Sequence, residues 1–494
     1  MIFDILEKKK NLDNRDAVIC GTDKITYSQL YHVSKKLGEY IANDQSEIVI
    51  IFMPNGIDYV VSYFGILCAG KIVYPISSKS KSDELISAIE RTQTTTILCS
   101  DETYMRAKEF KDMKNLNLIN MNYFRKFETS LNISNEVVGR RDKKEFSVLL
   151  NTSGSTDIHK IVMLSEEGII TNCNDWIKAA LNPEDVGRIL VAMPACTSFG
   201  TIVITTAIIL GWTIFFSPTF FNSATLLKTI EDKQITHLVC IGSMLNILAK
   251  DITNFPTGDK YNSLKFIGIG GNKAVPETMK TMMRFFKYAG ISPGYGITEA
   301  TCIVTAIAPN ISKENETLFL EKIESAGVPF ENVHISIGEK LDETMNVGEI
   351  LVSGPTVMKG YYNNKAATSA TLKEGILHTG DIGYIDNEGY LFIVGRSKNI
   401  IKSGGYTIFP EEVEAVLQSL ECIKEAYVYG VMDDILDEKI VADVILNRSG
   451  QICLDEIKKA CLEHLADYKV PETINIVNKI QKTKTGKIYR KVSR

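Results

Sequence analysis

The stretch LLNTSGSTDIHK, from Leu149 to Lys160, gathers four hydroxyl side chains around Gly154 and ends on a lysine. It follows an apolar segment that is typical of a buried strand. Such a loop suits a polyphosphate, because glycine lets the backbone approach, hydroxyl and amide groups donate, and the lysine neutralises charge. An ordinary Ser/Thr turn after a buried strand would have the same composition. The GxxxxGK[ST] spacing is absent, so a Walker-type NTPase is disfavoured.

Length and composition narrow the classes of protein to which this chain can belong. At 494 residues it exceeds what one hydrophobic core usually organises, so we expect at least two domains. A formal net charge of -5 gives no general polyanion-binding signature, which argues against a nucleic-acid partner. Ten cysteines without a CxxC pair or a metal-type His/Cys spacing are typical of reduced thiols and predict a cytoplasmic protein without a disulfide framework.

One uncharged segment raises the question of a membrane span. Phe199 to Phe216 carries no charged residue over eighteen positions. Its threonines and the break at Gly211 favour a buried helix that turns into a buried strand. We therefore expect no membrane span.

Strand-like and helix-like runs alternate through the N-terminal part of the chain. This alternation of strands and helices predicts parallel sheets with helices on their faces. Several of the strands end in glycine or small polar residues, which is where α/β folds place ligand sites. The expected strands are 47–53, 71–76, 95–99, 188–193, 213–216, 237–241 and 264–269, and the first of them are separated by helical segments at 58–68 and 82–91.

The pattern changes in the C-terminal part. From about Val333 it becomes a series of shorter strands separated by glycine, which suggests a small antiparallel unit. The last segment has a βαβ-like pattern of its own and is long enough for a separate lid domain. Its expected elements are helix 410–420, strands 425–431 and 440–446, helix 454–465 and strand 473–477. We therefore predict an N-terminal ATP- and acyl-binding domain, 1–396, and a C-terminal lid domain, 397–494.

Five short motifs occur in one fixed order along the chain. They are TSGST with Lys160 at 152–160, GYGITE at 294–299, LHTGD at 377–381, GRSKNIIKSGGYTIFPEEVE at 395–414 and KTKTGKIYR at 482–490. Together they resemble the acyl-adenylate-forming superfamily, which comprises acyl- and aryl-CoA synthetases, adenylation domains of nonribosomal synthesis and luciferases. The resemblance covers nearly the whole chain and is closest to acyl-CoA ligases. It implies an α/β fold: a large N-terminal domain of two sheets with flanking helices and a small antiparallel barrel-like unit, followed by a small mobile α+β lid.

The resemblance implies a reaction in two steps. A carboxylate attacks the α-phosphate of ATP to give acyl-AMP and pyrophosphate, and a thiol then displaces AMP. Such chemistry needs positioning and charge neutralisation more than covalent help from the protein. The implied cofactors are ATP and Mg²⁺, with coenzyme A or the phosphopantetheine of a carrier protein as the acceptor. The implied catalytic residues are Lys487, between the incoming carboxylate and the α-phosphate, Glu299 as the metal ligand, Thr298 beside the α-phosphate, and Lys160 in the phosphate loop.

A nucleotide site and a hinge are also implied by the resemblance. Tyr295 offers its ring face to adenine, and Asp381 accepts from both ribose hydroxyls while Arg396 approaches the same sugar. Lys398 resembles the family's hinge. The SGG at 403–405 would line a thiol tunnel, although a plain turn is the alternative. For Lys487, the alternative is one charge in a solvated basic tail. The cofactor-binding residues implied are Thr152, Ser153, Gly154, Ser155, Thr156, Gly271, Gly294, Tyr295, Gly296, Asp381, Ile393, Arg396, Lys402, Ser403, Gly404 and Gly405.

The phosphate loop departs from the family's pattern. Asp157, His159 and Ile161 stand where members usually carry a glycine, a proline and a glycine. A carboxylate at the loop tip would repel the leaving pyrophosphate, and the lost glycine stiffens the loop. This departure predicts slower adenylation.

The gate segment, 194–200, bears on the choice of acid. Thr197 stands where a histidine is common, and Ser198 stands where amino-acid-activating members carry aspartate and aryl-acid members tend to carry asparagine. We therefore expect a small carboxylic acid without an α-amino group, in an uncharged pocket that suits an aliphatic or small aromatic acid. The predicted pocket residues are Thr197, Ser198, Phe199, Cys240, Gly268 and Gly270.

The sequence thus favours an AMP-forming acid–thiol ligase of the acyl-CoA synthetase type. One rival is a stand-alone adenylating enzyme that loads an acyl carrier protein by the same chemistry. A rival of another class is a nucleotide-binding homologue with little turnover, which the altered phosphate loop motivates.

Overall fold

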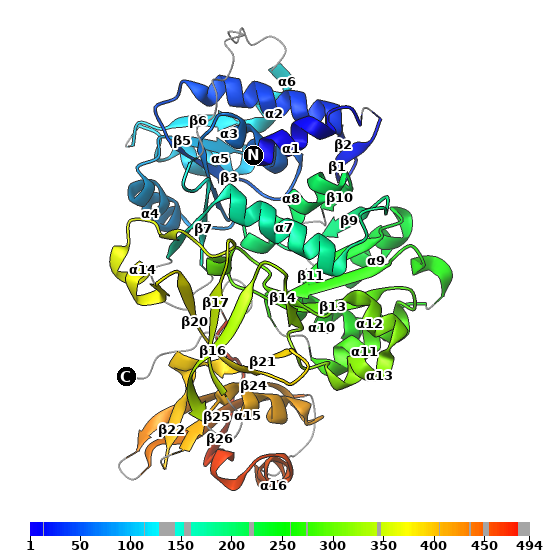
Figure 1. Cartoon of the computed structure of the whole chain (residues 1–494), viewed down its shortest axis with the longest axis vertical. Coiled ribbons are helices and arrows are strands. Elements are labelled where there is room, and N and C mark those ends of the chain that lie inside the picture. The colour runs from blue at the N-terminus through cyan, green and yellow to red at the C-terminus, as the bar shows by residue number, and fades with distance from the viewer. Residues whose placement is uncertain are drawn as a thin grey trace. The chain divides into compact units, whose positions relative to one another are not determined.

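The computed structural model describes residues 1–12, 14–112, 114–127, 144–152, 160–216, 222–256, 258–272, 275–342, 347–404, 406–433, 436–447 and 454–482. These residues fall into two compact units, and Figure 1 labels many of their elements. The first unit comprises described residues of 1–152, 160–334 and 353–377, and the second those of 335–352 and 378–482. The predicted domain boundary after Arg396 lies inside the second unit, and it stays a prediction about which part of the chain moves as a lid.

The larger sheet of the first unit has nine strands among the described residues. Its central neighbours are parallel, and antiparallel pairs occur at its two ends. The predicted strands at 188–193, 213–216, 237–241 and 264–269 all lie in it. In spatial order the strands are β15 (Val328–Pro329), β14 (Thr305–Ala306), β13 (Gly290–Tyr295), β12 (Phe266–Gly270), β11 (His237–Ile241), β9 (Arg188–Val191), β10 (Thr213–Phe216), β1 (Asp16–Cys20) and β2 (Asp23–Thr26).

A second sheet, of seven strands in the part of the chain that the structure describes, also belongs to the first unit. Strands β3 and β4 are buried along their whole length, as expected for parallel strands covered on both faces. The antiparallel pair β7–β8 flanks the phosphate loop, and the amide of Thr152 donates to the carbonyl of Lys160 at 3.0 Å. In spatial order the strands are β18 (Gly360–Tyr361), β8 (Ile161–Leu164), β7 (Val148–Asn151), β4 (Ile72–Ile76), β3 (Ile48–Phe52), β5 (Thr96–Cys99) and β6 (Asn117–Asn120).

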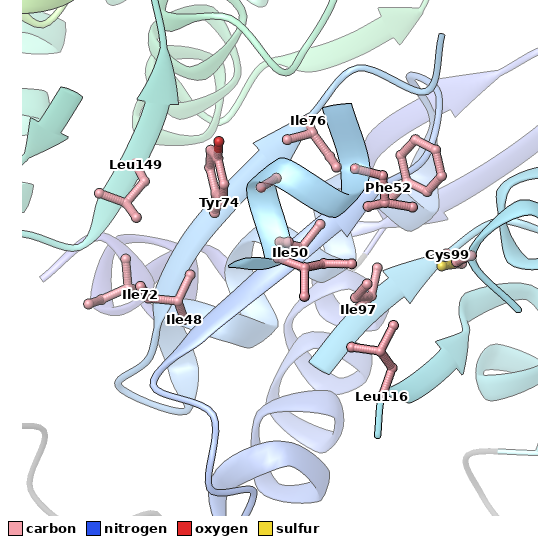
Figure 2. Packing of buried hydrophobic residues seen from close by; sticks show 14 of the residues in the cluster. Ile48, Ile50, Phe52, Ile72, Tyr74, Ile76, Ile97, Cys99, Leu116 and Leu149 are labelled. Atoms are coloured by element: carbon pink, nitrogen blue, oxygen red, sulfur yellow. The ribbon is translucent and has the colours of Figure 1, made fainter. Parts of the chain in front are cut away.

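Alternate side chains of this sheet form one core (Figure 2). A strand repeats every two residues, so every second side chain points to the same face. The hydroxyl of Tyr74, in this core, donates to Oδ1 of Asn151 at 2.9 Å, which ties β4 to the strand end where the phosphate loop begins. The strand residues in this core include Ile48, Ile50 and Phe52 of β3, Ile72, Tyr74 and Ile76 of β4, and Ile97 and Cys99 of β5.

Helices of the first unit flank these sheets. Helices α2 and α3 lie side by side (Figure 1). They approach closely at Gly38, where the missing side chain leaves room, because a Cβ there would lie 2.7 Å from the Cβ of Cys68. The described helices of this unit are α1 (Ile2–Lys9), α2 (Tyr27–Ala42), α3 (Ile57–Cys68), α4 (Ser82–Thr92), α5 (Asp101–Lys108), α6 (Met121–Phe127), α7 (Glu166–Ala180), α8 (Ser198–Leu210), α9 (Ser223–Asp232), α10 (Gly242–Asp251), α11 (Pro276–Phe285), α12 (Pro309–Glu314), α13 (Glu316–Glu321) and α14 (Lys365–Thr371).

The uncharged segment Phe199 to Phe216 folds as the sequence predicts. It forms the buried helix α8 and then the buried strand β10, with Gly211 between them at φ +71° as the left-handed helix cap. Within the described residues, no helix is both long enough and apolar enough to cross a membrane.

The antiparallel strands expected from about Val333 are present. Strands β20 and β21 pair antiparallel, with Asp381 opposite Arg396, and β19 pairs antiparallel with the start of β20. This pairing matters for the site because it fixes the LHTGD segment at a known register. The strands are β16 (His334–Asp342), β17 (Val347–Ser353), β20 (Ile376–Ile385) and β19 (Leu372–Lys373) in spatial order, with β21 (Leu391–Arg396) beside β20.

The C-terminal elements form their own sheet, which matches the predicted βαβ-like pattern in part. Strand β26 pairs parallel with β25 across helix α16, whereas β24 and β25 form an antiparallel hairpin. The connection between β24, which ends at Asp433, and β25, which begins at Asp437, is too short for the crossover that parallel neighbours need. The core between sheet and helices includes Val413, Leu417, Ile457 and Cys461. The elements are β22 (Ile401–Ser403), β23 (Tyr406–Ile408), α15 (Pro410–Ser419), β24 (Ile423–Asp433), β25 (Asp437–Leu446), α16 (Leu454–His464) and β26 (Thr473–Ile476).

Candidate active site

The gate segment, 194–200, follows β9 and runs into the first turn of α8. It is held by the side chains of Asn55, just before α3, and Tyr59, in the first turn of α3. The amide Nδ2 of Asn55 donates to the carbonyl of Met193 at 2.8 Å, and its Oδ1 accepts from the amide of Ala195 at 2.8 Å. The hydroxyl of Tyr59, which is buried, donates to the carbonyl of Ala195 at 2.9 Å. The backbone amide and the carbonyl of Ala195 are therefore both held by side chains from outside the segment.

Thr197, which stands where a histidine is common, has a local structural task. Its hydroxyl accepts from the amide of Gly200 at 3.1 Å and donates to the carbonyl of Pro194 at 2.9 Å. This is the geometry of a helix N-cap, which satisfies an amide at the start of α8. Thr197 thus shapes the gate, and its place in the substrate pocket stays a prediction.

The GYG motif ends strand β13. A Cβ at Gly294 would lie 2.6 Å from the carbonyl oxygen of Thr305, and one at Gly296 would lie 1.4 Å from that of Cys302. Both positions need glycine because the returning backbone passes directly against them. Tyr295 is thereby fixed between them near the carboxyl end of the parallel sheet, where α/β folds bind ligands.

Thr298 and Glu299 form the short 3₁₀ turn η4 (Thr298–Ala300) just after β13. The hydroxyls of Thr298 and Ser198 lie 3.4 Å apart, so the structure brings the GYGITE motif and the gate together. The next residue, Thr301, has φ +71°, a conformation that side-chain-bearing residues rarely adopt. Its hydroxyl donates to the carbonyl of Thr356. Such strain concentrates at functional sites.

Tyr361 joins two of the predicted catalytic residues, and no sequence motif points to it. Its hydroxyl donates to Oε1 of Glu299 at 2.8 Å, and the ammonium nitrogen of Lys160 lies 4.6 Å from the centre of its ring. Lys160, a cation, and Glu299, a carboxylate, are therefore neighbours of one buried side chain. Only the two-residue strand β18 carries Tyr361, and so short a strand gave no periodic signal to find it by.

The predicted pocket residues do not all share one face of the sheet. A Cβ at Gly270 would lie 2.9 Å from the ring of Phe199, and one at Gly268 would lie 2.8 Å from the ring of Phe266. The two glycines therefore let aromatic rings lie directly on β12. Cys240 pairs with the residue between them, Ile269, so its side chain points to the opposite face. The structure thus brings Phe199 and Gly270 together and separates Cys240 from them.

Burial makes the cysteines of this region poor nucleophiles. It raises the pKa of Cys240 to about 12 and that of the gate residue Cys196 to about 11. The pKa of Cys302 is also raised, chiefly by burial, although the Ser198 hydroxyl opposes the shift. Because the thiolate is the reactive form, these side chains act as small apolar groups at neutral pH.

The second unit contains the predicted ribose anchor. Asp381 is 4% exposed, and its Oδ1 lies 2.6 Å from Nε of Arg396, its cross-strand partner. Its own amide donates to the hydroxyl of Thr379 at 3.0 Å, and that hydroxyl in turn donates to the carbonyl of Ile350 at 2.7 Å. The structure therefore brings Asp381 and Arg396 together, as the resemblance implies.

Glu349 of β17 holds the backbone of β20 just before Asp381, and no sequence motif points to it. Its Oε1 accepts from the amide of Gly380 at 2.9 Å, and its Oε2 lies 2.8 Å from Nδ1 of His378. Gly380 has φ +71°, which glycine adopts without strain. A glutamate in a strand carries no sequence signal for this role, since only the neighbouring position of β17 and β20 in the sheet brings it to Gly380.

The predicted hinge and thiol-tunnel residues lie around β22. Lys398 is exposed in the 3₁₀ turn η5 (Ser397–Asn399), and Ile393 lies in β21. The ammonium of Lys402 donates to the hydroxyl of Thr407 at 2.6 Å. Ser403 is buried, and Gly404 has φ +55° and donates its amide to the carbonyl of Leu436 at 2.9 Å. The plain turn that is the alternative at 403–405 is consistent with the described part of this segment, and the thiol tunnel stays a prediction.

Comparison with known proteins settles the family. The sequence model described as AMP-binding enzyme matches residues 7–362, and the one described as AMP-binding enzyme C-terminal domain matches residues 412–487. The chain belongs to the AMP-binding enzyme family. This confirms both the resemblance to the adenylate-forming superfamily and the expectation of an enzyme.

Relatives of this AMP-binding enzyme extend over almost its whole length. A 2-succinylbenzoate–CoA ligase of Bacillus licheniformis is 27% identical and covers 97% of this chain and 96% of its own. A long-chain-fatty-acid–CoA ligase of Bacillus subtilis is 29% identical, with 95% and 89% covered. Among solved structures, the O-succinylbenzoate coenzyme A synthetase of Bacillus subtilis in complex with ATP and magnesium ion is 24% identical, with a TM-score of 0.86 and 99% of both chains covered. That likeness confirms the fold.

Some predicted site residues of this AMP-binding enzyme lie outside the described residues. They are Ser153, Gly154, Ser155, Thr156, Gly405 and Lys487, together with the loop departures Asp157 and His159. Of the remaining cofactor residues, Gly271 is described, with φ +76° and a close approach to Ile241. Ile161, the third departure, is the fully buried first residue of β8, so core packing accounts for an apolar residue there.

The residues around Glu299 fit a magnesium ion that arrives with its nucleotide. Within the described residues, no group of three or more His, Cys, Asp or Glu side chains could hold a metal by itself. Mg²⁺ is usually held by one or two carboxylates together with substrate phosphates, so the single carboxylate of Glu299 is sufficient. Bound there, the ion would neutralise phosphate charge.

Proposed function

We propose that this AMP-binding enzyme activates a small carboxylic acid with Mg²⁺ and ATP to give an acyl-adenylate, and then transfers the acyl group to coenzyme A. The observation that carries the proposal is the arrangement at Tyr361, which holds a cation, Lys160, and a carboxylate, Glu299, in one place. Family membership supports it, as do the relatives over almost the whole length of the chain that are named CoA ligases.

The proposed roles follow from charge. Lys160 would neutralise phosphate, Glu299 would hold the magnesium ion, and Thr298, whose hydroxyl lies near that of Ser198, would face the α-phosphate. In the second unit, Asp381 with Arg396 would bind the ribose. Lys487 would offset the repulsion between the incoming carboxylate and the α-phosphate. The lid that carries it would begin at residue 397 and turn about Lys398.

The acid is proposed to lack an α-amino group. Ser198 stands at the first turn of α8, where a carboxylate would be needed to pair an ammonium, and its neutral hydroxyl lies beside that of Thr298. The ring of Phe199 lies against Gly270 and supplies an apolar wall. These features support an aliphatic or small aromatic acid as substrate.

The test is acid-dependent release of pyrophosphate from ATP over a broad panel of carboxylic acids. We expect release with at least one acid, and we expect Lys487→Ala to lower it by at least about 100-fold, as for the loss of one transition-state charge partner, while ATP binding persists. Lys482→Ala, which removes another cation of the same tail, is the matched control. If ATP binds but no acid releases pyrophosphate, the nucleotide-binding homologue with little turnover is the correct reading.

The acceptor needs a separate measurement, because a stand-alone enzyme that loads a carrier protein would pass the first test. Free coenzyme A and a phosphopantetheinylated carrier protein would be offered to the enzyme with the active acid. We expect the CoA thioester. Acylation of the carrier alone would reject the CoA ligase and leave the adenylation step standing.

A further inference from the structure

We propose that Tyr361 is a positioning residue that sets the carboxylate of Glu299 and the ammonium of Lys160 for metal-bound ATP. This role rests on the proposed function. Tyr361 is 4% exposed and uses two different parts of its side chain, since the hydroxyl donates to Oε1 of Glu299 at 2.8 Å and the ring face lies 4.6 Å from the Lys160 ammonium. One side chain therefore links the residues proposed to bind metal and phosphate.

The backbone of Tyr361 is fixed independently of both partners. Strand β18 pairs antiparallel with β8, with Tyr361 opposite Val162, and the amide of Tyr361 donates to the hydroxyl of Thr368 in α14 at 2.9 Å. Lys160 lies two residues before Val162, so it is the diagonal neighbour of Tyr361 on the same face. The contact between ammonium and ring therefore follows from the register of the two strands.

The segment 356–361, which ends at Tyr361, also fixes the backbone around Glu299. The amide of Met358 donates to the carbonyl of Glu299 at 2.8 Å, and the carbonyl of Thr356 accepts from the hydroxyl of Thr301. Thr301 is the residue with the strained φ of +71°. Segment 356–361 therefore holds Glu299 at two points. The amide of Met358 holds the backbone carbonyl of Glu299, and the hydroxyl of Tyr361 holds its carboxylate. That double attachment is what a preorganised metal carboxylate needs.

The two contacts of Tyr361 have separable consequences. A hydrogen bond to a metal-ligating carboxylate orients it, and loss of such a partner typically weakens metal affinity by about 10–100-fold. The ring face attracts a cation through its negative quadrupole and keeps the ammonium over one spot. Removing the hydroxyl should therefore affect the metal, whereas removing the ring should affect the phosphate as well.

A purely structural role makes a different prediction. If Tyr361 only filled the core, Tyr361→Phe would preserve its volume and leave metal binding unchanged. Tyr362 provides the matched control, because it is adjacent, half-buried, and packs in the core against Phe146 at 6.1 Å between ring centroids. Tyr362→Phe also removes one phenol hydroxyl from the same segment.

The experiment measures binding of Mn²⁺, as a paramagnetic replacement for Mg²⁺, to the ATP complex of the full chain by electron paramagnetic resonance, without any acid substrate. We expect Tyr361→Phe to weaken Mn²⁺ binding at least about 10-fold, with Tyr362→Phe unchanged. Tyr361→Leu should in addition weaken binding of metal-free ATP, because Lys160 loses the ring beneath it. Thermal unfolding of the variants without ligand shows whether the fold is kept.

A double-mutant cycle tests the route through Glu299. In a Glu299→Ala background, Tyr361→Phe should cause no further loss of Mn²⁺ affinity, because the hydroxyl has lost the group that it orients. An equal loss in both backgrounds, or wild-type Mn²⁺ affinity in Tyr361→Phe, overturns the positioning role and leaves the proposed ligase function intact. A wild-type chain that binds no Mn²⁺ with ATP overturns both.

Discussion

Acid should destabilise the first unit through His237, a histidine buried in an aromatic cluster on β11. Its side chain is 2% exposed, its ring centroid lies 4.1 Å from that of Trp212, and Phe266 lies 5.6 Å away. The hydroxyl of Thr236 lies 2.7 Å from its Nδ1. Burial lowers the pKa of His237 from 6.5 to about 4, with smaller and opposing effects from Asp185 and Lys265. The folded protein therefore holds this imidazole neutral.

The sign and size of the effect follow from that pKa. The unfolded chain takes up a proton at its ordinary pKa of 6.5, while the folded chain does so only near 4. The contribution to stability is therefore complete above pH 6.5, is lost progressively as the pH falls from 6.5 to about 4, and changes no further below that. A difference of about 2.5 in pKa corresponds to about 3 kcal/mol, a large part of the stability of an ordinary domain.

Tryptophan fluorescence is the natural assay, because the chain has two tryptophans and both lie in this cluster. Trp212 contacts His237, and Trp176 lies 6.2 Å from Phe266 between ring centroids. Urea unfolding followed by this emission should give a free energy of unfolding that falls by about 3 kcal/mol more in the wild type than in His237→Phe between pH 7 and pH 4. His32→Gln, at an exposed histidine of α2, should keep the wild-type dependence.

The comparison of the wild type with His237→Phe isolates one group, since these two chains share all other titrating side chains. Equal loss of stability in the wild type and in His237→Phe would show that protonation of His237 does not cause the loss. A titration of the folded protein in which Trp212 emission changes near pH 6.5, and not near pH 4, would contradict the lowered pKa of His237.

Two further predictions concern the site. Glu349→Ala removes the acceptor of the Gly380 amide and the partner of His378. Since a hydrogen bond to a charged group contributes about 1.5–3 kcal/mol, we expect the affinity for AMP, measured by calorimetry, to fall at least about 10-fold. Glu339→Ala, at an exposed glutamate of β16, is its control, and unchanged AMP affinity in Glu349→Ala would contradict the prediction. Gly296→Ala places a Cβ 1.4 Å from the carbonyl of Cys302, so we expect a loss of about 1–3 kcal/mol in thermal unfolding together with weaker ATP binding. Gly338→Ala, whose Cβ would meet its nearest atoms at 3.4 Å, should change neither, and wild-type behaviour of Gly296→Ala would be incompatible with the described backbone.

The elements and the motifs could be predicted from the sequence, because both depend on residues close together in the chain. Buried strands such as β3 and β4 appear as short β-branched runs, and the interval between them is enough to predict parallel pairing. The TSGST, GYGITE and LHTGD motifs locate Lys160, Glu299 and Asp381 without any coordinates.

The tertiary structure alone decided which distant residues act together. Tyr361 meets Glu299 and Lys160 because β18 pairs with β8, and Glu349 meets Gly380 across a strand pairing. The same kind of register turned Cys240 away from Gly268 and Gly270, with which the sequence had grouped it. The physical reason is that local periodicity fixes which face of a strand a residue occupies, whereas the partner opposite that face depends on hydrogen bonds between segments far apart in the chain.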